Sequence, residues 1–332
     1  MRVLVTGGAG YIGSHVCKAL KAEGFTPVTF DNFSTGNGWA VRYGPLERGD
    51  LCDPHRLNEV FATHKPGAVV HCAASGLVGE SMTKPAIYYR NNVVGTVNLL
   101  EACRLFGLEA FVFSSSCATY GVPDTVPIAE TTPQNPINPY GATKLIGERM
   151  LADYQMAYGV PVAMLRYFNA AGADVDGEIG ERRDIETHLV PLMLDSILKR
   201  RPMLKVFGDD YPTPDGTALR DYVHITDLAE VHVAALRRLL DGKGPIVTNV
   251  GTGVPYSVLQ LITAAERVTG RPTPYEKAGR RAGDPPQLSA DAAHFESLFG
   301  TNALKRSTLD QIIATAWRWH LALDQREPAA SL

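Results

Sequence analysis

Short apolar runs alternate with longer stretches of helical periodicity through the first half of the chain. The apolar runs cover residues 2–6, 26–30, 46–50, 68–72, 110–115 and 162–166. The stretches with helical spacing cover residues 14–23, 54–64, 88–106 and 140–158. Near-continuous apolar strands that alternate with helices are typical of a parallel, doubly wound α/β sheet, and we predict that fold class.

The second half of the chain alternates less regularly. Helical spacing recurs at residues 189–199, 227–240, 257–269 and 309–323. The apolar run at residues 246–250, which is followed by Gly251-Thr252-Gly253, is typical of one more strand of the first sheet. The sequence therefore predicts a smaller, interleaved C-terminal α/β domain. We expect residues 1–169 plus about 221–251 in the first domain, and about 170–220 and 252–332 in the second.

A glycine turn joins the first predicted strand to the first predicted helix. It reads Thr6-Gly-Gly-Ala-Gly-Tyr-Ile-Gly13, with glycines at 7, 10 and 13 that let the backbone approach a pyrophosphate at a helix N-terminus. Asp31 ends the next strand. An acid there accepts the two hydroxyls of an adenosine ribose and repels a 2′-phosphate, so the pattern favours NAD over NADP.

Tyr140 and Lys144 are four residues apart on the predicted helix at 140–158 and therefore share one face. A free phenol, with a pKa of about 10, is ionised only to about one part in a thousand at pH 7. A nearby ammonium lowers such a pKa by about 1–3 units. We therefore expect Lys144 to turn Tyr140 into a usable proton acceptor.

Polar residues follow several predicted strands at the edge where a doubly wound sheet binds ligands. Asp50, Cys72-Ala73-Ala74 and Ser114-Ser115-Ser116 stand at such ends. Asn91, inside a helical stretch, either reaches this crevice or is an ordinary surface residue. Five prolines between residues 123 and 139 predict a stiff loop that fixes Ser116 relative to Tyr140.

Composition narrows the classes of partner. The 332 residues are 45% hydrophobic and carry a net charge of -3 without a long basic run, which argues against nucleic acid or an anionic membrane as a partner. Five dispersed cysteines indicate neither a disulfide framework nor a zinc site. The first apolar run is too short for a signal peptide, and no run reaches transmembrane length. We expect a soluble, cytoplasmic protein.

Together these motifs resemble the extended short-chain dehydrogenase/reductase superfamily, whose nucleotide domain has the Rossmann fold, and within it the UDP-glucose 4-epimerases. The resemblance covers nearly the whole chain. Its further marks are Asp31-Asn32, Val78-Gly-Glu-Ser81, Tyr88 to Thr96, Phe113-Ser-Ser-Ser-Cys-Ala-Thr-Tyr-Gly121, Leu165-Arg-Tyr-Phe-Asn169, Phe207-Gly-Asp-Asp-Tyr-Pro-Thr213, Arg220-Asp-Tyr-Val-His224 and Arg281-Ala-Gly-Asp284.

The resemblance implies a role for each matching residue. Tyr140 would be the acid/base, Lys144 would tune it and bind the nicotinamide ribose, and Ser116 would hydrogen-bond the sugar 4-hydroxyl. The positions that match NAD contacts are Gly7, Gly10, Tyr11, Ile12, Gly13, Asp31, Asn32, Asp50, Leu51, Cys72, Ala73, Asn91, Tyr140, Lys144 and Phe168. Those that match contacts to the UDP-sugar are Ser116, Asn169, Leu189, Phe207, Arg220, Arg281 and Asp284. No metal is implied, and relatives suggest a homodimer built on the 88–106 and 140–158 helices.

Three residues depart from the family pattern, and two of them, His188 and Leu288, leave the sugar range open. Gly76 stands where many relatives carry a lysine, His188 replaces a common asparagine, and Leu288 occupies a position that gates N-acetylated sugars. A 4-epimerase of UDP-pentoses or of UDP-N-acetylhexosamines is therefore the main alternative to UDP-glucose and UDP-galactose. A nucleotide-sugar dehydratase would need a carboxylate beside Ser116, and a non-catalytic NAD-binding protein would not need Tyr140 and Lys144. His71, His188 and His224 are each expected to be structural.

Overall fold

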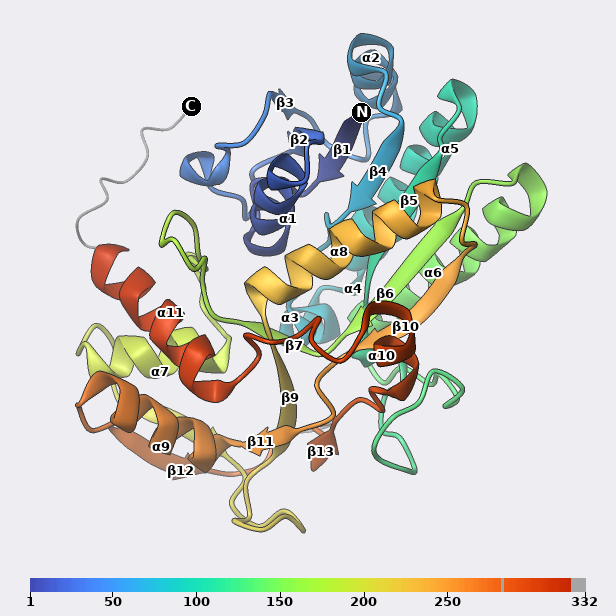
Figure 1. Cartoon of the computed structure of the whole chain (residues 1–332). Coiled ribbons are helices and arrows are strands. Elements are labelled where there is room, and N and C mark those ends of the chain that lie inside the picture. The colour runs from blue at the N-terminus through green and yellow to red at the C-terminus, as the bar shows by residue number, and fades with distance from the viewer. Residues whose placement is uncertain (282–283, 324–332) are drawn as a thin grey trace.

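Seven parallel strands form the main sheet of the computed structural model, which describes residues 1–281 and 284–323 (Figure 1). The order across the sheet is β10-β6-β5-β4-β1-β2-β3. The strands are β1 (Arg2–Thr6), β2 (Thr26–Asp31), β3 (Leu46–Arg48), β4 (Ala68–His71), β5 (Ala110–Ser116), β6 (Val162–Tyr167) and β10 (Ile246–Val250). The chain order reverses between β1 and β4, and ligands bind above such a reversal. The doubly wound α/β prediction is confirmed, including the late strand at 246–250.

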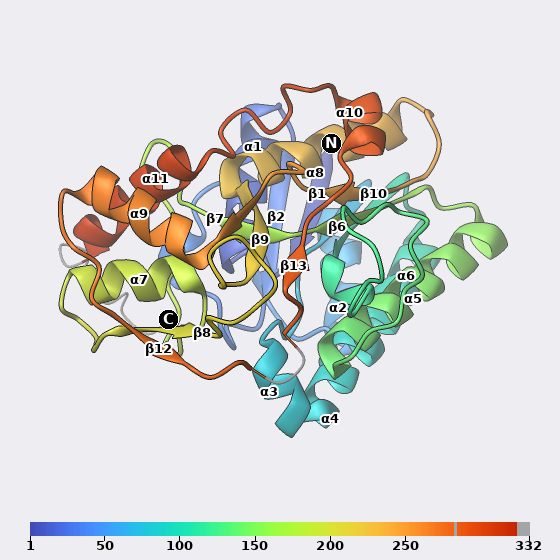
Figure 2. The same cartoon turned by 90° about the horizontal axis from the view of Figure 1, so that it is seen from below.

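Helices cover both faces of this sheet, as Figure 2 shows. Val3 and Val5 point to one face, where they pack in a cluster with α1 (Tyr11–Ala22) and α8 (Ile225–Leu240). Leu4 points to the other face, towards α2 (Pro54–His64), α5 (Gly95–Phe106) and α6 (Pro139–Tyr158). Side chains alternate along a strand, so an apolar run with no polar alternation buries both faces.

The second half of the chain adds two small sheets and three packed helices. One sheet has the order β11-β9-β13 with β7 on β9, and the other pairs β12 with β8. These strands are β7 (Asn169–Ala171), β8 (Leu204–Phe207), β9 (Leu219–His224), β11 (Pro255–Ser257), β12 (Tyr275–Ala278) and β13 (Gln287–Leu288). The helices α7 (Leu189–Ile197), α9 (Val258–Thr269) and α11 (Leu309–Leu323) share an apolar core, and α10 (Ala293–Phe299) packs near β10. The proposed domain boundaries stay a prediction.

The helix expected over residues 88–106 is present, but a π-helical turn lies within it. After α3 (Val78–Thr83) the chain forms α4 (Pro85–Tyr88), a π-helical turn at Tyr89–Val94 and then α5. Asn92 lies within the π turn and is buried. Its side chain accepts from the Ser75 backbone N–H at 2.8 Å and donates to Thr143 Oγ1 at 3.0 Å. The wider turn points an amide towards α6, and apolar spacing carries no signal for such a turn.

Other element ends differ from the predictions by a few residues. The first helix begins at Tyr11 rather than residue 14, β3 ends at Arg48 rather than residue 50, and α7 ends at Ile197 rather than residue 199. Short 3-10 turns occupy Gly38–Ala40 and Cys117–Thr119. Within the described part of the chain, no helix has both the length and the apolar character needed to cross a bilayer.

Candidate active site

The glycine turn makes a tight backbone surface at the end of β1. Gly7 has φ +70°, and a Cβ there would lie 2.7 Å from the Ala73 backbone nitrogen. A Cβ on Gly13 would lie 2.1 Å from the Gly7 carbonyl oxygen. Gly10 caps α1 without a side chain, so the first N–H groups of that helix stay open to an anion. This cradle fits the pyrophosphate of a dinucleotide.

Asp31 is held in place at the end of the neighbouring strand. Its carboxylate accepts from the Ala9 N–H at 3.0 Å and from the Phe33 N–H at 2.8 Å. Burial raises the pKa of Asp31, and these two donors oppose the rise. The acid is thus fixed beside the glycine turn, as a ribose-binding carboxylate must be.

Next to Asp31 lies a cavity of about 470 Å³, whose lining includes Asn32, Asp50, Ser75 and Asn91. Asn32 Nδ2 donates to Asp50 Oδ2 at 3.0 Å. The structure therefore brings together three residues that the resemblance assigned to NAD, and Asn91 reaches the crevice. Leu51 is buried beside them.

Tyr140, Lys144 and Ser116 meet where β5 ends and α6 begins. Asn138 caps α6 by accepting from the Gly141 N–H at 2.8 Å. Lys144 Nζ donates to the Ser114 carbonyl oxygen at 2.7 Å and lies 5.9 Å from the centre of the Tyr140 ring. Ser116 hydrogen-bonds the Tyr140 hydroxyl. The three predicted catalytic residues are thus together at the carboxyl edge of the sheet.

The pKa of Tyr140 does not show the expected lowering by Lys144, which is not among the groups that shift it. Burial raises the pKa of Tyr140 to about 12, although the Ser116 hydrogen bond lowers it. Burial also lowers the pKa of Lys144 to about 8, although the Cys72 thiol and the Glu148 carboxylate each raise it. Desolvation disfavours the charged form of both groups, and it is the largest cause of each shift.

The residues assigned to the UDP side gather on the second half of the chain. Arg220, on β9, forms an ion pair with Asp284. The Arg281 guanidinium lies 3.9 Å from the centre of the Phe207 ring. Residues 282–283 lie outside the described residues. Two arginines near each other suit a diphosphate, because each presents a planar set of N–H donors.

The other assigned residues stand at element ends. Asn169 begins β7 and Leu189 begins α7. Cys72 is half-buried, and its thiol accepts from Ser114 Oγ at 3.4 Å. Phe168 packs in a small buried cluster with Tyr120 and Ile128, so its side chain exposes almost no surface.

A model of the NAD dependent epimerase/dehydratase family matches residues 3–251. The chain belongs to this family. The UDP-glucose 4-epimerase of Rhizobium leguminosarum bv. trifolii is 51% identical over 323 residues, which cover 97% of this chain and 98% of that one. These matches confirm the resemblance to UDP-glucose 4-epimerases.

Solved structures of the family agree with the fold described above. The UDP-glucose 4-epimerase from Brucella ovis in complex with NAD has a TM-score of 0.92 and 53% identity, covering 95% of this chain and 97% of its own. The UDP-Glc/GlcNAc 4-epimerase from Campylobacter jejuni has a TM-score of 0.84 and 40% identity, covering 96% and 99%.

A buried polar network, which no sequence motif indicated, lies next to Lys144. Glu148, one helical turn after Lys144, accepts from Arg166 Nη2 at 2.7 Å and from Ser115 Oγ at 2.5 Å. Arg166 Nη1 donates to Tyr120 Oη at 2.8 Å. The network ties α6 to β5 and β6. Its one sequence signal was the repeated four-residue spacing of Tyr140, Lys144 and Glu148.

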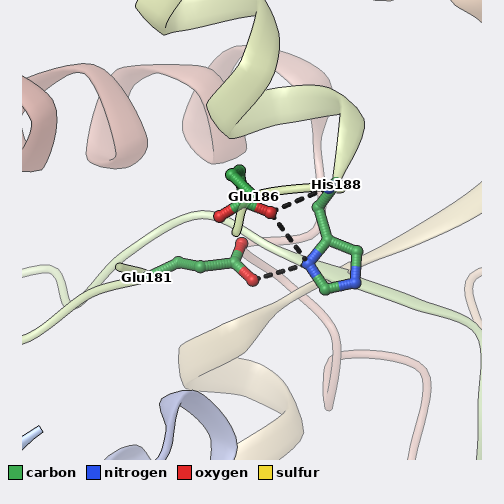
Figure 3. A group of neighbouring side chains, drawn as sticks. All are labelled: Glu181, Glu186 and His188. Atoms are coloured by element: carbon green, nitrogen blue, oxygen red, sulfur yellow. Dashed lines mark hydrogen bonds and ion pairs between the residues drawn. The ribbon is translucent and has the colours of Figure 1, made fainter. Parts of the chain in front are cut away.

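Figure 3 shows a second group that the motifs did not reveal, formed by Glu181, Glu186 and His188. Their ligand-type atoms lie within 4.8 Å of one another, the spacing of a metal site. However, Glu181 Oε1 accepts from His188 Nδ1 at 2.7 Å and from Arg183 Nε at 3.0 Å. Glu186 Oε1 accepts the backbone N–H groups of residues 187 and 188. These contacts satisfy the carboxylates without a cation, and they describe an ion-pair network.

Proposed function

We propose that the chain is an NAD-dependent UDP-glucose 4-epimerase that interconverts UDP-glucose and UDP-galactose. The observation that carries the proposal is the meeting of Tyr140, Lys144 and Ser116 above the strand reversal, beside the glycine turn. Relatives with this name match nearly the whole chain.

The residues divide the reaction into positioning and proton transfer. The glycine turn and Asp31 would hold NAD, which would supply the redox chemistry at C4 of the sugar by taking up a hydride and giving it back. Tyr140 takes the proton from O4 and gives it back, and Ser116 orients the same oxygen. Lys144 holds a positive charge beside the ring of Tyr140, 5.9 Å from its centre.

Inversion requires that the sugar turn over while the nucleotide stays bound. Arg220 and Arg281 would hold the diphosphate, with Asp284 and Phe207 beside them. These four side chains lie on β8, β9 and the segment before β13, so the anchor is built apart from Tyr140 on α6. A fixed diphosphate and a loosely held ring allow either face of C4 to meet the cofactor.

A second candidate activity is 4-epimerisation of UDP-N-acetylhexosamines. Leu288 is half-buried on β13, directly opposite Arg220 on β9, next to the anchor. A leucine leaves more room there than a tyrosine. The Campylobacter jejuni relative, named a UDP-Glc/GlcNAc 4-epimerase, supports this breadth. A UDP-pentose is smaller than either hexose and is a third substrate to test.

Two further properties belong to the proposal. The exposed apolar residues Val94, Leu105 and Phe106 near or on α5, and Met156 and Tyr158 on α6, support a homodimer that packs these helices against their copies. The five cysteines are free thiols, which suits a reducing compartment such as the cytoplasm. We expect a UDP-sugar as the substrate, and neither nucleic acid nor a membrane as a partner.

The proposal is tested by incubating purified protein, without added cofactor, separately with UDP-galactose, UDP-N-acetylgalactosamine and UDP-arabinopyranose. NMR then identifies the products. Conversion of UDP-galactose to UDP-glucose is expected, and it also shows that NAD stays bound. Failure to convert any of the three, even with NAD supplied, would overturn the 4-epimerase proposal.

A further inference from the structure

The segment between β7 and α7 lies against the glycine turn of the other half of the molecule. Tyr11, at the start of α1, donates its hydroxyl to the Gly172 carbonyl oxygen at 2.7 Å. Asn37 Nδ2 donates to the Arg182 carbonyl oxygen at 3.2 Å, and the Asn37 N–H donates to Ala9 at 2.9 Å. Residues 172–182 are therefore tied at two points to the loop that forms the pyrophosphate cradle.

Glu181 gives this segment a rigid carboxylate. Its side chain is buried, and its carbonyl oxygen accepts from Trp319 Nε1 at 2.8 Å. The preceding Gly180 packs so closely on the Trp319 indole that a Cβ would lie 2.5 Å from the ring. The backbone and the carboxylate of Glu181 are both fixed, so a side chain that binds Glu181 Oε1 is held in a defined position.

Arg183 is such a side chain, and it binds Glu181 through Nε of its guanidinium group. Nε donates to Glu181 Oε1 at 3.0 Å. In residues 1–281 and 284–323, neither terminal nitrogen of Arg183 has a hydrogen-bond partner. The side chain is 26% exposed, so these nitrogens are not sealed in the core. An arginine fixed through Nε presents its two terminal NH₂ groups as a fork.

Arg183 directly follows Arg182, whose carbonyl oxygen binds Asn37 beside the glycine turn. Burial raises the pKa of Tyr11 and of Tyr140, and Glu181 raises that of Tyr11 further, whereas the positive charge of Arg183 lowers both. His188, on the same Glu181 oxygen, immediately precedes α7 and has no side-chain capping bond to that helix. The open N-terminus of α7 adds to the positive potential on this side. Arg183 thus lies next to the loop that forms the nucleotide cradle.

We propose that Arg183, held by Glu181, is a diphosphate-binding residue of the crevice. Its terminal NH₂ groups donate to the non-bridging oxygens of a diphosphate, the arrangement in which arginine binds this group most strongly. The inference rests on the proposed function, in which two ligands carry a diphosphate, NAD and the UDP-sugar. The chemistry is the same for both, and the experiment distinguishes them.

The test compares Arg183→Gln with Arg182→Gln. Arg182 is exposed, and in the described residues only its carbonyl oxygen makes a hydrogen bond, so the control removes the same charge one residue away. Two properties are measured: bound NAD per chain after gel filtration, and the dissociation constants of UDP and of uridine by calorimetry. Wild-type protein is measured first.

Arg183→Gln is expected to weaken binding of at least one diphosphate by about tenfold or more, the usual effect of losing a charge-assisted contact. A loss confined to NAD assigns the residue to the dinucleotide. A loss confined to UDP, with uridine binding unchanged, assigns it to the sugar nucleotide. Arg182→Gln should stay within about twofold of wild type, and Arg183→Lys, which keeps charge without the fork, should fall between the two.

Unchanged binding of both NAD and UDP by Arg183→Gln would overturn the inference and leave the proposed function standing. Wild-type protein that binds neither ligand would overturn both. A thermal melt of the two glutamine variants distinguishes a diphosphate-binding role of Arg183 from a purely structural one. If the role is purely structural, Arg183→Gln should lower the melting temperature without a selective loss of UDP binding over uridine binding.

Discussion

Lys144 Nζ lies 5.9 Å from the centre of the Tyr140 ring and donates to the Ser114 carbonyl oxygen at 2.7 Å. One helical turn separates the two residues at the start of α6, where Lys144 is buried and Tyr140 is half-buried. The lysine is therefore anchored to the end of β5, and the tyrosine hydroxyl meets Ser116 of the same strand. The contributions of Tyr140 and Lys144 can therefore be tested by substituting each residue separately.

Tyr140→Phe should lower turnover by orders of magnitude and leave NAD bound. The substitution removes the hydroxyl that exchanges the proton with O4 and keeps the ring that fills the site. The matched control is Tyr154→Phe on the same helix, whose hydroxyl contacts Glu101 away from the site. The initial rate with UDP-galactose and the NAD content per chain are the two readouts. Near wild-type turnover by Tyr140→Phe would exclude this residue as the base.

Lys144→Met should stabilise the protein most at low pH. In the folded chain the pKa of Lys144 is about 8, below the value of 10.5 in the unfolded chain. Between these two pH values the folded chain therefore holds fewer protons than the unfolded chain. The penalty, about 3 kcal/mol by linkage, is full below pH 8 and fades as the pH rises towards 10.5. Urea unfolding should show the advantage of the variant shrinking by about 2 kcal/mol from pH 7 to pH 10. A stability difference between variant and wild type that does not change with pH would contradict the burial argument.

Gly13→Ala should abolish stable NAD binding. The new methyl group would lie 2.1 Å from the Gly7 carbonyl oxygen, a backbone atom that cannot turn aside. Forcing this contact costs about 1–3 kcal/mol and opens the turn. Gly76→Ala is the matched control, because a Cβ at residue 76 meets open space. Equal NAD content in the two variants would contradict the claim that the close contact between Gly13 and the Gly7 carbonyl oxygen is needed for NAD binding.

Glu148→Gln should destabilise the fold by about 3–5 kcal/mol, because it leaves the buried Arg166 guanidinium without its counter-charge. Arg166 Nη2 lies 2.7 Å from the Glu148 carboxylate, and both side chains are less than 10% exposed. The exposed pair of Arg56 and Glu59 provides the control, and Glu59→Gln should change stability by less than about 1 kcal/mol. Chemical unfolding at pH 7 measures the free energy of unfolding of both variants. Similar losses in the two variants would contradict the prediction and would mean that water screens the buried pair.

The glycine turn, the strands and the Tyr140 helix could be predicted from the sequence because each depends on local rules. Apolar runs define parallel strands, and Pro54–His64 matches its helical pattern at both ends. Asp31 follows from its place at a strand end. These features need no knowledge of what packs against them.

The π-helical turn and the Arg183 site could not be predicted in this way. Asn92 turns inward because Ser75 and Thr143 lie there to receive its amide, and both are distant in sequence. Residues 172–188 have no periodicity, so only the folded path brings Glu181 and Arg183 next to the loop of the glycine turn. The pKa of Tyr140 also depends on burial, which the spacing to Lys144 does not report.

Direct transfer at C4 is tested most sharply with UDP-galactose that carries deuterium at that carbon. The wild-type protein, in ordinary water and without added cofactor, should form UDP-glucose that keeps the deuterium at C4, because the transferred hydride never meets solvent. Tyr140→Phe should form little product in the same time. Deuterium lost to water during conversion would contradict hydride transfer and return within the site.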